Sequence, residues 1–320
     1  MHYDIFNGDA DGIIALHQLR LAEPREAELV TGVKRDIGLL KRVPATAGAG
    51  DSVTALDIAV EKNAEPLSAL LARGVAVVWF DHHNPGPIPS HPALHAHIDT
   101  SAETCTSLIV DRHLAGRHRT WAVAAAYGDN LAEAACTAAE SLGLDDGQCA
   151  VLRELGECVN YNGYGDTVAD LHFHPADLYR CLHAYTDPFA FVAEAPEFAA
   201  LRDGYRNDMA LARASQPVEA RSGGAIFVLP DAAWARRVSG VYANELASSH
   251  PQRAHALVTR SPRGHLVVSV RAPLANRVGA DVLCGRFETG GGRKAAAGIN
   301  VLPEARLADF TAAFFDTYGT

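Results

Sequence analysis

Stretches of apolar residues alternate with amphipathic stretches along the first 130 residues of the chain. Short strand-like runs at 2–6, 52–56 and 75–80, of which the last is apolar throughout, predict strands, whereas apolar positions at helical spacing predict helices over about 11–22 and 63–73. Strands and helices that follow one another in this way form βαβ units around a mainly parallel sheet. The pattern therefore predicts an α/β fold for the N-terminal part of the chain.

Helical patterns dominate the next part of the chain. Pro85, Pro87, Pro89 and Pro92 first predict an irregular loop, because proline lacks the backbone donor that a strand or helix needs. An ordered turn is expected at 160–165. Alanine-rich, helix-like segments cover about 104–115, 119–127, 131–142, 147–160 and 175–184.

Strand-like patterns return in the C-terminal third. Apolar runs at 225–229, 254–260 and 265–271 predict strands, a glycine-rich turn follows at 290–292, and a last helix is expected over about 303–318. These runs predict a second, smaller α/β domain.

The chain is therefore expected to contain two domains joined by a connector. We predict a catalytic domain over 1–190, a connector over 191–223 with one polar helix at about 197–214, and a substrate-binding domain over 224–320. An active-site cleft is expected between the two domains.

Charge is unevenly distributed along the chain. The net charge is −10 overall, but residues 225–320 hold 11 Lys and Arg against 7 Asp and Glu, whereas residues 1–224 hold 17 against 31. Such an acidic chain is a poor candidate for binding duplex DNA, which depends on neutralising many phosphates. The asymmetry fits carboxylates that bind metal in one domain and arginines that bind a small anion in the other, although chance is an alternative explanation.

Targeting signals are not evident. The chain has no apolar run of about 18 residues or more, so no membrane-spanning helix is predicted, and its N-terminus lacks the pattern of a signal peptide. The six cysteines are scattered, with no Cys-x-x-Cys pair, and are expected to be reduced. We therefore expect a cytoplasmic protein without membrane contact.

Acidic and imidazole side chains follow three of the predicted strands. Asp9 and Asp11 come after the first strand, Asp57 after the second, and the sequence Asp81-His82-His83 after the third. Because the carboxyl ends of parallel strands meet at one edge of a sheet, where ligands bind, these groups are candidates for a divalent-metal site. Taken singly, the aspartates are equally typical of helix caps or turns, and the histidine pair of a solvated loop.

Two further motifs indicate a functional site only when they are considered together with these acids and histidines. Asp129 follows Gly128 at a predicted helix end, and would be an ordinary helix stop if it stood alone. The stretch 290–298 contains three consecutive glycines and then Arg293, and Arg271 ends a predicted strand. Exposed glycine N–H groups beside arginines, with a small-residue helix start after them, can bind phosphate, although a glycine triplet is usually a flexible turn.

The ordered set of motifs resembles the DHH phosphoesterase family, in the branch that has a DHH-associated C-terminal domain and that includes RecJ-type exonucleases, nanoRNases and pAp phosphatases. The resemblance covers nearly the whole chain, and the four N-terminal motifs in this order are specific. The motifs are Asp9-x-Asp11-Gly12, Asp57, Asp81-His82-His83, Gly128-Asp129, the Ser-x-Arg strand at 269–271 and the glycine-rich element at 290–298.

The resemblance implies a role for each matched position. One manganese-like ion would be held by Asp11, Asp57, His82 and Asp129, and a second by Asp9 and Asp57. His83 would lie beside the scissile phosphate, which makes His83 and Asp57 the catalytic candidates. The other phosphate or the sugar of the substrate would be bound by Arg271, Gly291, Gly292 and Arg293.

Two positions depart from the family pattern. Many members have a histidine four residues before the first motif aspartate, where this chain has Ile5. The second metal site therefore lacks an imidazole, and could be weaker or use Asn7 or water. The glycine-rich motif usually continues with histidine, whereas this chain has Arg293, which bears on the choice of substrate more than on the reaction.

These features predict a manganese-dependent phosphoesterase that hydrolyses small nucleotides: short oligoribonucleotides, linear dinucleotides such as pGpG, or pAp. Two ions about 3.5–4 Å apart would clamp a phosphoryl oxygen and activate a bridging water. A site that contains histidine suits Mn²⁺ better than Mg²⁺, although Mg²⁺ or Co²⁺ could substitute. The sequence shows no series of aromatic side chains on which the bases of a long single strand could stack, which favours a short single-stranded substrate. We also expect that the chain can form a homodimer.

Two other functions remain open, and a third is disfavoured. A polyphosphate or pyrophosphate hydrolase needs no base recognition and would use the same metal site. A catalytically degenerate member could act as a nucleotide sensor, given the departures at Ile5 and Arg293. An oxidoreductase is disfavoured, because the first strand lacks Gly-x-Gly-x-x-Gly and leads into acids that would repel a dinucleotide's pyrophosphate.

Overall fold

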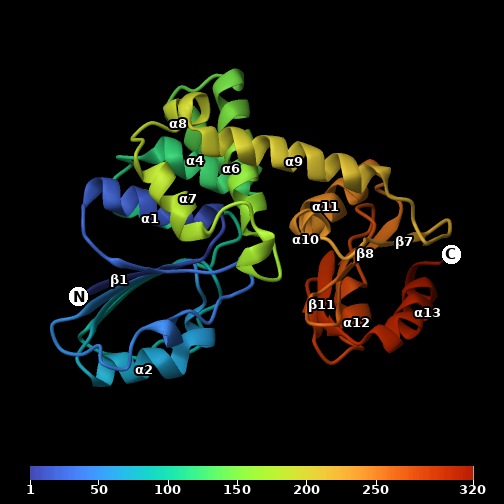
Figure 1. The fold of residues 1–320 in the computed structure, drawn as a ribbon, viewed down its shortest axis with the longest axis horizontal. Coiled ribbons are helices and arrows are strands. Elements are labelled where there is room, and N and C mark those ends of the chain that lie inside the picture. Colours follow the sequence, from blue (N-terminus) through green and yellow to red (C-terminus); the bar gives the residue numbers. More distant parts are fainter. Residues whose placement is uncertain (320) are drawn as a thin grey trace. The chain divides into compact units, whose positions relative to one another are not determined.

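A computed structural model describes residues 1–319 of the chain. It divides into two compact units, Met1–Asp203 and Gly204–Thr320, and each is built around its own sheet (Figure 1). The helix α9 (Pro196–Ala214) contains the boundary between the units.

The sheet of the first unit is entirely parallel, which confirms the predicted α/β fold. Its strands lie in the order β2-β1-β3-β4-β5, with β1 paired to β3 in the register Ile5↔Ala55 and β3 paired to β4 in the register Ala55↔Trp79. The bounds are β1 (His2–Phe6), β2 (Glu28–Val30), β3 (Ser52–Leu56), β4 (Ala76–Asp81) and β5 (Leu94–Ile98).

Two strands of this sheet were not predicted from the sequence. The strand β2 has three residues, which is too short for an alternation of apolar and polar positions to show. The strand β5 lies where an irregular loop is predicted, because its sequence contains two histidines and follows four prolines. The prolines lie before the strand, and His97 is accommodated by stacking on Phe80, with ring centroids 4.5 Å apart.

Helices cover both faces of this sheet (Figure 1). On one face, Leu67, Leu70 and Leu71 of α2 form an apolar cluster with residues of the strands, among them Val53 and Val77. The other face is covered by α1 and α3, and α4, α6 and α7 pack against α1. The bounds are α1 (Ala10–Ala22), α2 (Ala64–Ala72), α3 (Thr106–His113), α4 (Arg119–Gly128), α5 (Ala132–Glu140), α6 (Asp146–Gly163), α7 (Pro175–His183) and α8 (Pro188–Glu194), with short 3₁₀ turns at Leu40–Arg42, Val60–Asn63 and Val168–Asp170.

Glycines allow α4 and α6 to cross at very short distance. A Cβ atom added to Gly156 would lie 1.9 Å from the carbonyl oxygen of Ala124, and one added to Gly128 would lie 2.7 Å from the carbonyl oxygen of Gly156. Neither position can accept a larger residue unless the helices move apart. The crossing therefore fixes the C-terminal end of α4, where Asp129 follows. The helix α6 also includes residues 160–163, where an ordered turn is predicted, so that expectation is wrong.

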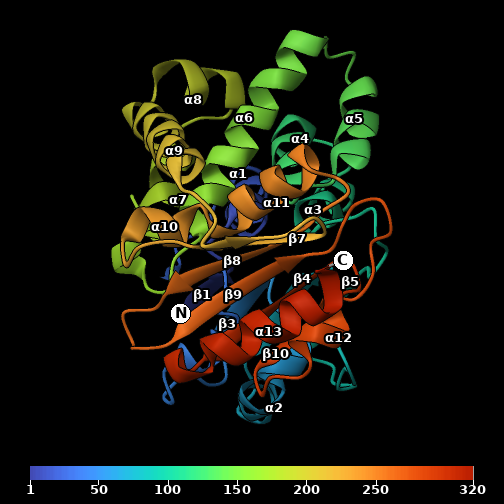
Figure 2. The ribbon, with the colours of Figure 1, turned by 90° about the vertical axis from the view of Figure 1, so that its right-hand side faces the viewer.

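The second unit contains a six-stranded sheet in the order β10-β11-β9-β8-β7-β6, in which β7 and β8 are parallel and the other pairs are antiparallel. The helices α12 and α13 pack on one face, and α10 and α11 on the other (Figure 2). The bounds are β6 (Glu219–Ala220), β7 (Gly224–Val228), β8 (Ala254–Arg260), β9 (Leu266–Arg271), β10 (Gly290–Gly292), β11 (Ala296–Leu302), α10 (Ala233–Arg237), α11 (Ser239–Ser249), α12 (Ala280–Cys284) and α13 (Leu307–Tyr318), with a 3₁₀ turn at Glu304–Arg306.

The glycine-rich element of the second unit is a β-hairpin, which corrects the predicted turn and helix start. The strand β10 consists of the three glycines and pairs with β11, where Gly292 is opposite Ala297. The backbone N–H of Arg293 donates to the carbonyl of Ala296 and closes the hairpin. The small residues that suggest a helix start belong to the strand β11 instead. At Gly298 a larger residue would be too close to β9, because an added Cβ atom would lie 2.7 Å from the carbonyl oxygen of Val268.

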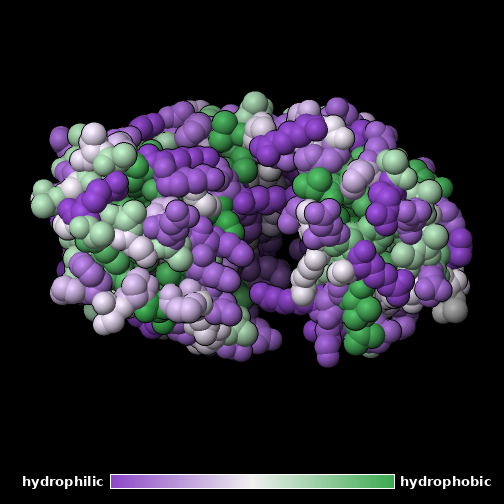
Figure 3. All heavy atoms as spheres, turned by 90° about the horizontal axis from the view of Figure 1, so that it is seen from below, coloured by the Kyte–Doolittle hydropathy of each residue, from purple (hydrophilic) through white to green (hydrophobic). Residues whose placement is uncertain are grey.

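The face of the molecule drawn in Figure 3 carries mostly hydrophilic residues. In the space-filling view, polar side chains cover most of the visible face of each unit, and apolar residues are scattered among them (Figure 3). Within residues 1–319, none of the helices has both the length and the apolar character that crossing a membrane requires.

Candidate metal centre

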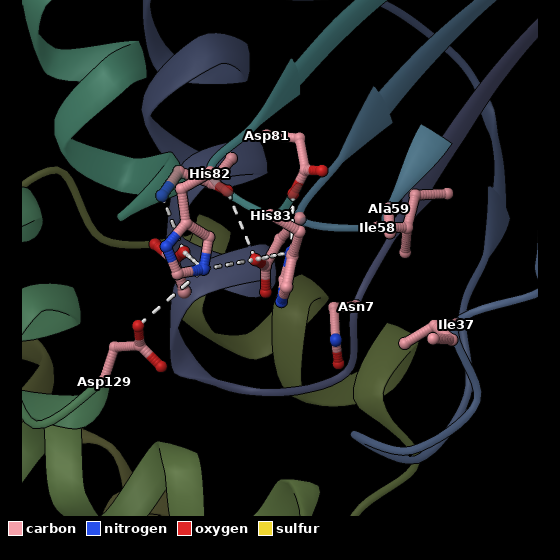
Figure 4. Close-up of polar contacts among 12 residues, drawn as sticks. Asn7, Ile37, Ile58, Ala59, Asp81, His82, His83 and Asp129 are labelled. Carbon is pink, nitrogen blue, oxygen red and sulfur yellow. Dashed lines mark hydrogen bonds and ion pairs between the residues drawn. The ribbon is translucent and has the colours of Figure 1, made fainter. Parts of the chain in front are cut away.

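Five aspartates and two histidines that lie far apart in the sequence gather at the carboxyl edge of the parallel sheet. Ligand atoms of Asp57, His82 and His83 lie within 4.8 Å of one another, and so do those of Asp11, His82 and Asp129. Figure 4 shows His82, His83 and Asp129 turned toward a common space, with Asn7 beside it. The remaining members of the cluster are Asp9 and Asp81.

Asp11 is held by the start of α3. Its two carboxylate oxygens accept hydrogen bonds from the backbone N–H groups of Thr106 and Ser107, each at 2.7 Å. The side chain is almost completely buried. The first N–H groups of a helix have no partner within the helix, so these two hydrogen bonds fix the Asp11 side chain in one orientation.

His82 is oriented by a backbone carbonyl. Its Nδ1 lies 3.0 Å from the carbonyl oxygen of Thr104. Because a carbonyl only accepts, Nδ1 carries the proton, and Nε2 keeps the lone pair that a metal needs. Nε2 lies 3.5 Å from Oδ1 of Asp57, 3.8 Å from Oδ2 of Asp129 and 4.0 Å from Oδ2 of Asp11.

Asp57 has an unusual backbone conformation. Its φ angle is 57°, in the left-handed region that residues other than glycine rarely adopt. Its N–H donates to the carbonyl of Phe80, and its Oδ1 accepts a hydrogen bond from the Thr106 hydroxyl at 3.2 Å. Asp57 is not a helix cap, which was the ordinary alternative, because the following 3₁₀ helix begins at Val60 with Ala59 as its cap.

His83 is paired with Asp81. The His83 Nδ1 lies 2.7 Å from Oδ1 of Asp81. Burial lowers the pKa of His83, but the hydrogen bond and the negative charge of Asp81 outweigh it, so the pKa lies above its ordinary value. The other oxygen of Asp81, Oδ2, is buried and has no hydrogen-bond partner among the described residues.

The carboxylates repel one another. Burial and the charges of Asp11, Asp9, Asp129 and Asp81 raise the pKa of Asp57 well above its usual range. Burial raises the pKa of Asp129 to about 6, with Lys34 opposing the shift and Asp11 adding to it. Buried acids packed this closely, with one carboxylate oxygen left without a partner, are the surroundings that a divalent cation stabilises. The donors, carboxylate oxygens with one imidazole, fit a first-row divalent ion.

Asp9 has a different partner from the other acids. As the N-cap of α1, it accepts a hydrogen bond from the N–H of Gly12 at 3.1 Å, so the ordinary interpretation of this aspartate as a helix cap applies as well. Its other oxygen, Oδ2, lies 2.5 Å from Nζ of Lys34, and this ammonium also lies 3.6 Å from Oδ1 of Asp129.

Lys34 was not recognised from the sequence. It follows β2, a strand too short to be predicted, so the sequence pattern did not place the Lys34 side chain at the edge of the sheet where the acids lie. The available signal was the pair Lys34-Arg35 after the apolar stretch that ends at Val33, in a chain where arginine greatly outnumbers lysine.

Ile5, the position where a histidine was expected by resemblance, does not face the cluster. Its side chain is completely buried in the apolar cluster on the α2 face of the sheet, together with Val30 and Leu67.

The predicted substrate-binding residues lie together in the second unit. Arg271 ends β9 directly opposite Ala296 of β11, and Ala296 accepts the hydrogen bond that closes the hairpin at Arg293. Gly291 and Gly292 are exposed on the edge strand β10. The Arg271 guanidinium donates to Oδ1 of Asn244 at 2.7 Å.

Solved structures of other proteins share the fold of this chain. Neither a protein-family model nor a curated protein matches the sequence. The exonuclease RecJ bound to manganese matches with a TM-score of 0.64 at 19% identity, covering 98% of this chain and 88% of that chain. RecJ in complex with Mn²⁺ from Thermus thermophilus matches with a TM-score of 0.63 at 19% identity, covering 98% of this chain and 51% of the other.

A third similar structure is a phosphodiesterase. The pGpG-specific phosphodiesterase PggH from Vibrio cholerae matches with a TM-score of 0.56 at 15% identity, covering 97% of this chain and 98% of that chain. Similarity that extends over nearly the whole chain at such low identity establishes a common architecture. The chain therefore shares the fold of RecJ and PggH, which agrees with the fold that the resemblance of its motifs to the DHH phosphoesterases implies.

Proposed function

We propose that the protein is a manganese-dependent phosphoesterase that hydrolyses phosphodiester or phosphomonoester bonds of small nucleotides. The observation that carries the proposal is the convergence of Asp11, Asp57, His82 and Asp129 at one edge of the parallel sheet. The fold shared with an exonuclease bound to manganese and with a pGpG-specific phosphodiesterase supports the same reaction class.

In this proposal, Asp11, Asp57, His82 and Asp129 hold a Mn²⁺ ion. When bound, the ion would supply a Lewis acid for a phosphoryl oxygen and would lower the pKa of a water molecule. The residues of the chain prepare the site beforehand: α3 fixes Asp11, and the Thr104 carbonyl fixes the tautomer of His82. A second ion held by Asp9 and Asp57 stays a prediction.

His83 and Asp57 are the proposed catalytic residues. Because Asp81 holds Nδ1 of His83 and raises the pKa of the imidazole against the effect of burial, the ring is protonated more readily than an ordinary histidine. Its Nε2–H can then donate to a phosphoryl oxygen, where negative charge develops in the transition state. Asp57 would contribute by binding the ion that activates the water.

The proposed substrates are pGpG-like dinucleotides, oligoribonucleotides of a few units, and pAp. Arg271 and Arg293 carry planar guanidinium groups suited to phosphate oxygens, and Gly291 and Gly292 leave the backbone of an edge strand open to a ligand. We propose that these four residues bind the part of the substrate that is not cleaved. A cytoplasmic location and a homodimer stay predictions from the sequence.

The test is a substrate panel with and without Mn²⁺. Linear dinucleotides, pAp, cyclic dinucleotides and inorganic polyphosphate are incubated with the full chain, and products are separated by chromatography. Release of mononucleotides or phosphate from a nucleotide substrate with Mn²⁺ but not with EDTA supports the proposal, provided that Asp57→Ala abolishes it. Hydrolysis of polyphosphate alone, or binding without turnover, would overturn it.

A further inference from the structure

A lysine already occupies the part of the site where a second metal ion is expected. The two-ion arrangement assigns Asp9 to the second ion. In the structure, Oδ2 of Asp9 is 2.5 Å from Nζ of Lys34, so the carboxylate and the ammonium are in direct contact as an ion pair.

The lysine is held in place along its length. Its backbone N–H donates to the carbonyl of Gly163 at 2.8 Å, and its own carbonyl accepts from the Asn7 amide at 3.3 Å. At the far end, the ammonium donates to Oδ1 of Asn160 at 3.0 Å and lies 5.4 Å from the centre of the Tyr164 ring. Contacts at both the backbone and the ammonium make this a positioned side chain, not a surface lysine that happens to reach an acid.

The Lys34 ammonium lies mainly on one side of the cluster. Its Nζ is 2.5 Å from Oδ2 of Asp9 but 3.6 Å from Oδ1 of Asp129. Asp57 and Asp129 instead face Nε2 of His82, at 3.5 and 3.8 Å. Lys34 thus compensates the charge of Asp9, and the carboxylates around His82 are the part of the cluster that a metal ion would occupy.

Lys34 disfavours a second ion at this position. A first-row divalent ion bound to the carboxylate oxygen that the ammonium contacts would lie about 2.1 Å from that oxygen, so the two cations would lie less than about 5 Å apart and would repel each other. The usual imidazole is also missing there, because Ile5 is buried in the apolar cluster on the α2 face. The ligand set of a second ion is therefore incomplete, and the Lys34 ammonium already compensates the charge of its carboxylate.

We propose that the Lys34 ammonium replaces the second cation, so that the centre binds a single divalent ion and Lys34 provides the other positive charge for the substrate's phosphoryl group. The inference rests on the proposed function and makes it more specific. An ammonium with three donors can contact a phosphoryl oxygen while it keeps Asp9 and Asn160.

The experiment measures how many manganese ions the full chain binds. Wild type, Lys34→Met and Lys34→Arg are studied by equilibrium dialysis and by electron paramagnetic resonance, with Lys62→Met as the control because Lys62 is an exposed lysine of a 3₁₀ turn. Wild type, Lys34→Arg and the control are expected to bind one ion with a mononuclear signal. Lys34→Met is expected to bind a second ion at least tenfold more tightly than wild type does, with an exchange-coupled signal.

The outcomes separate the two proposals. Two tightly bound, exchange-coupled ions in the wild type would overturn the role of Lys34 and leave the phosphoesterase proposal standing. One ion in wild type and in Lys34→Met alike would also overturn it. If one ion is bound as expected but no substrate of the panel is hydrolysed, the phosphoesterase proposal fails and the cation replacement stands. Absence of bound manganese in every variant would end both.

Discussion

The carboxylate of Asp57 lies 3.5 Å from Nε2 of His82, and Asp57 reaches this position only through a left-handed backbone with a φ angle of 57°. Such a conformation is unfavourable for a residue with a side chain and persists where the surrounding structure imposes it. Two hydrogen bonds hold Asp57 in this conformation: its N–H donates to the carbonyl of Phe80, and its carboxylate accepts from the Thr106 hydroxyl. The strain and the charge repulsion at Asp57 are thus costs that the fold bears in order to bring these two groups together.

Replacing Asp57 by asparagine should stabilise the metal-free protein. Asparagine tolerates the left-handed conformation and keeps the shape of the side chain, but it removes a buried charge surrounded by other acids. We expect the free energy of unfolding in EDTA to rise by about 1 kcal/mol, within the usual range for relieving functional strain. Thermal unfolding with EDTA measures this.

The same variant should lose stabilisation by manganese. Wild type is expected to gain thermal stability as Mn²⁺ is added, because the ion binds the folded state only. Asp57→Asn should show little of this gain. A variant that is destabilised in EDTA, or that responds to Mn²⁺ as wild type does, would show that Asp57 is not a ligand.

The neighbouring histidines should differ in their effects. His82→Ala removes the imidazole whose Nε2 faces three carboxylates, so affinity for Mn²⁺ should fall by more than about 100-fold, beyond the loss usual for supporting residues around a metal. His83→Ala should keep manganese but lower kcat by about 10²–10³-fold, the range seen when one donor to a developing charge is lost. Metal dialysis together with turnover separates the two; equal loss of manganese in both would contradict the division of roles.

The crossing of α4 and α6 should be intolerant of a single methyl group. In Gly156→Ala, the new Cβ would lie 1.9 Å from a backbone oxygen, so the helices must separate. Overpacking of this kind costs about 1–3 kcal/mol, and urea unfolding measures it. The matched control is Gly147→Ala in the first turn of the same helix, where the nearest atom is a side-chain oxygen at 3.2 Å and little change is expected. Equal stability of both variants would refute the close crossing.

A buried ion pair between strand β1 and helix α1 predicts a dependence of stability on pH. Arg20 contacts both oxygens of Asp4, at 2.8 Å from Nε and 2.5 Å from Nη2, and His2 adds a third contact. Burial raises the pKa of Asp4, but the hydrogen bonds and charges of Arg20 and His2 outweigh it, so the pKa is lowered in the folded state. The folded state therefore binds this proton less readily than the unfolded chain does.

The pair consequently stabilises the fold above the unfolded pKa of about 3.9 and ceases to do so as the pH falls through the folded value. In Asp4→Asn, the buried guanidinium loses its counter-charge, and the free energy of unfolding at neutral pH should fall by about 3–5 kcal/mol. Urea titrations between pH 3 and 7 measure both effects. The difference between wild type and variant should shrink toward the acid end, and a constant difference would contradict the assignment to Asp4.

The alternation of apolar and polar residues was sufficient to predict the elements that carry the acids, but not their neighbours in the sheet. Strands β1, β3 and β4 have five or six residues with clear apolar runs, so their ends could be located. The strand β2 is too short to leave a pattern, and β5 presents histidines where a strand usually presents apolar residues. The glycines of β10 have no side chains that could indicate a strand; pairing with β11 decides their conformation.

The same limit applies to the site. Acids that follow strands could be listed from the sequence, because the end of a parallel strand points to a known edge of the sheet. The groups that orient these acids and His82 could not be listed, because no sequence motif marks the segments from which they come. The backbone of Thr106 and Ser107, the carbonyl of Thr104 and the ammonium of Lys34 act through position alone.

One short segment, residues 104–107, touches both Asp11 and His82 through its main chain. Two prospective ligands are thus aligned by peptide groups, which every amino acid except proline supplies in full. Side chains on the outer surface of α3 can therefore vary widely over evolutionary time without disturbing the geometry, whereas a proline at 106 or 107, or an insertion between 104 and 107, would dismantle it. A change of length within these four positions should therefore be far more harmful than a substitution on the exposed side of α3.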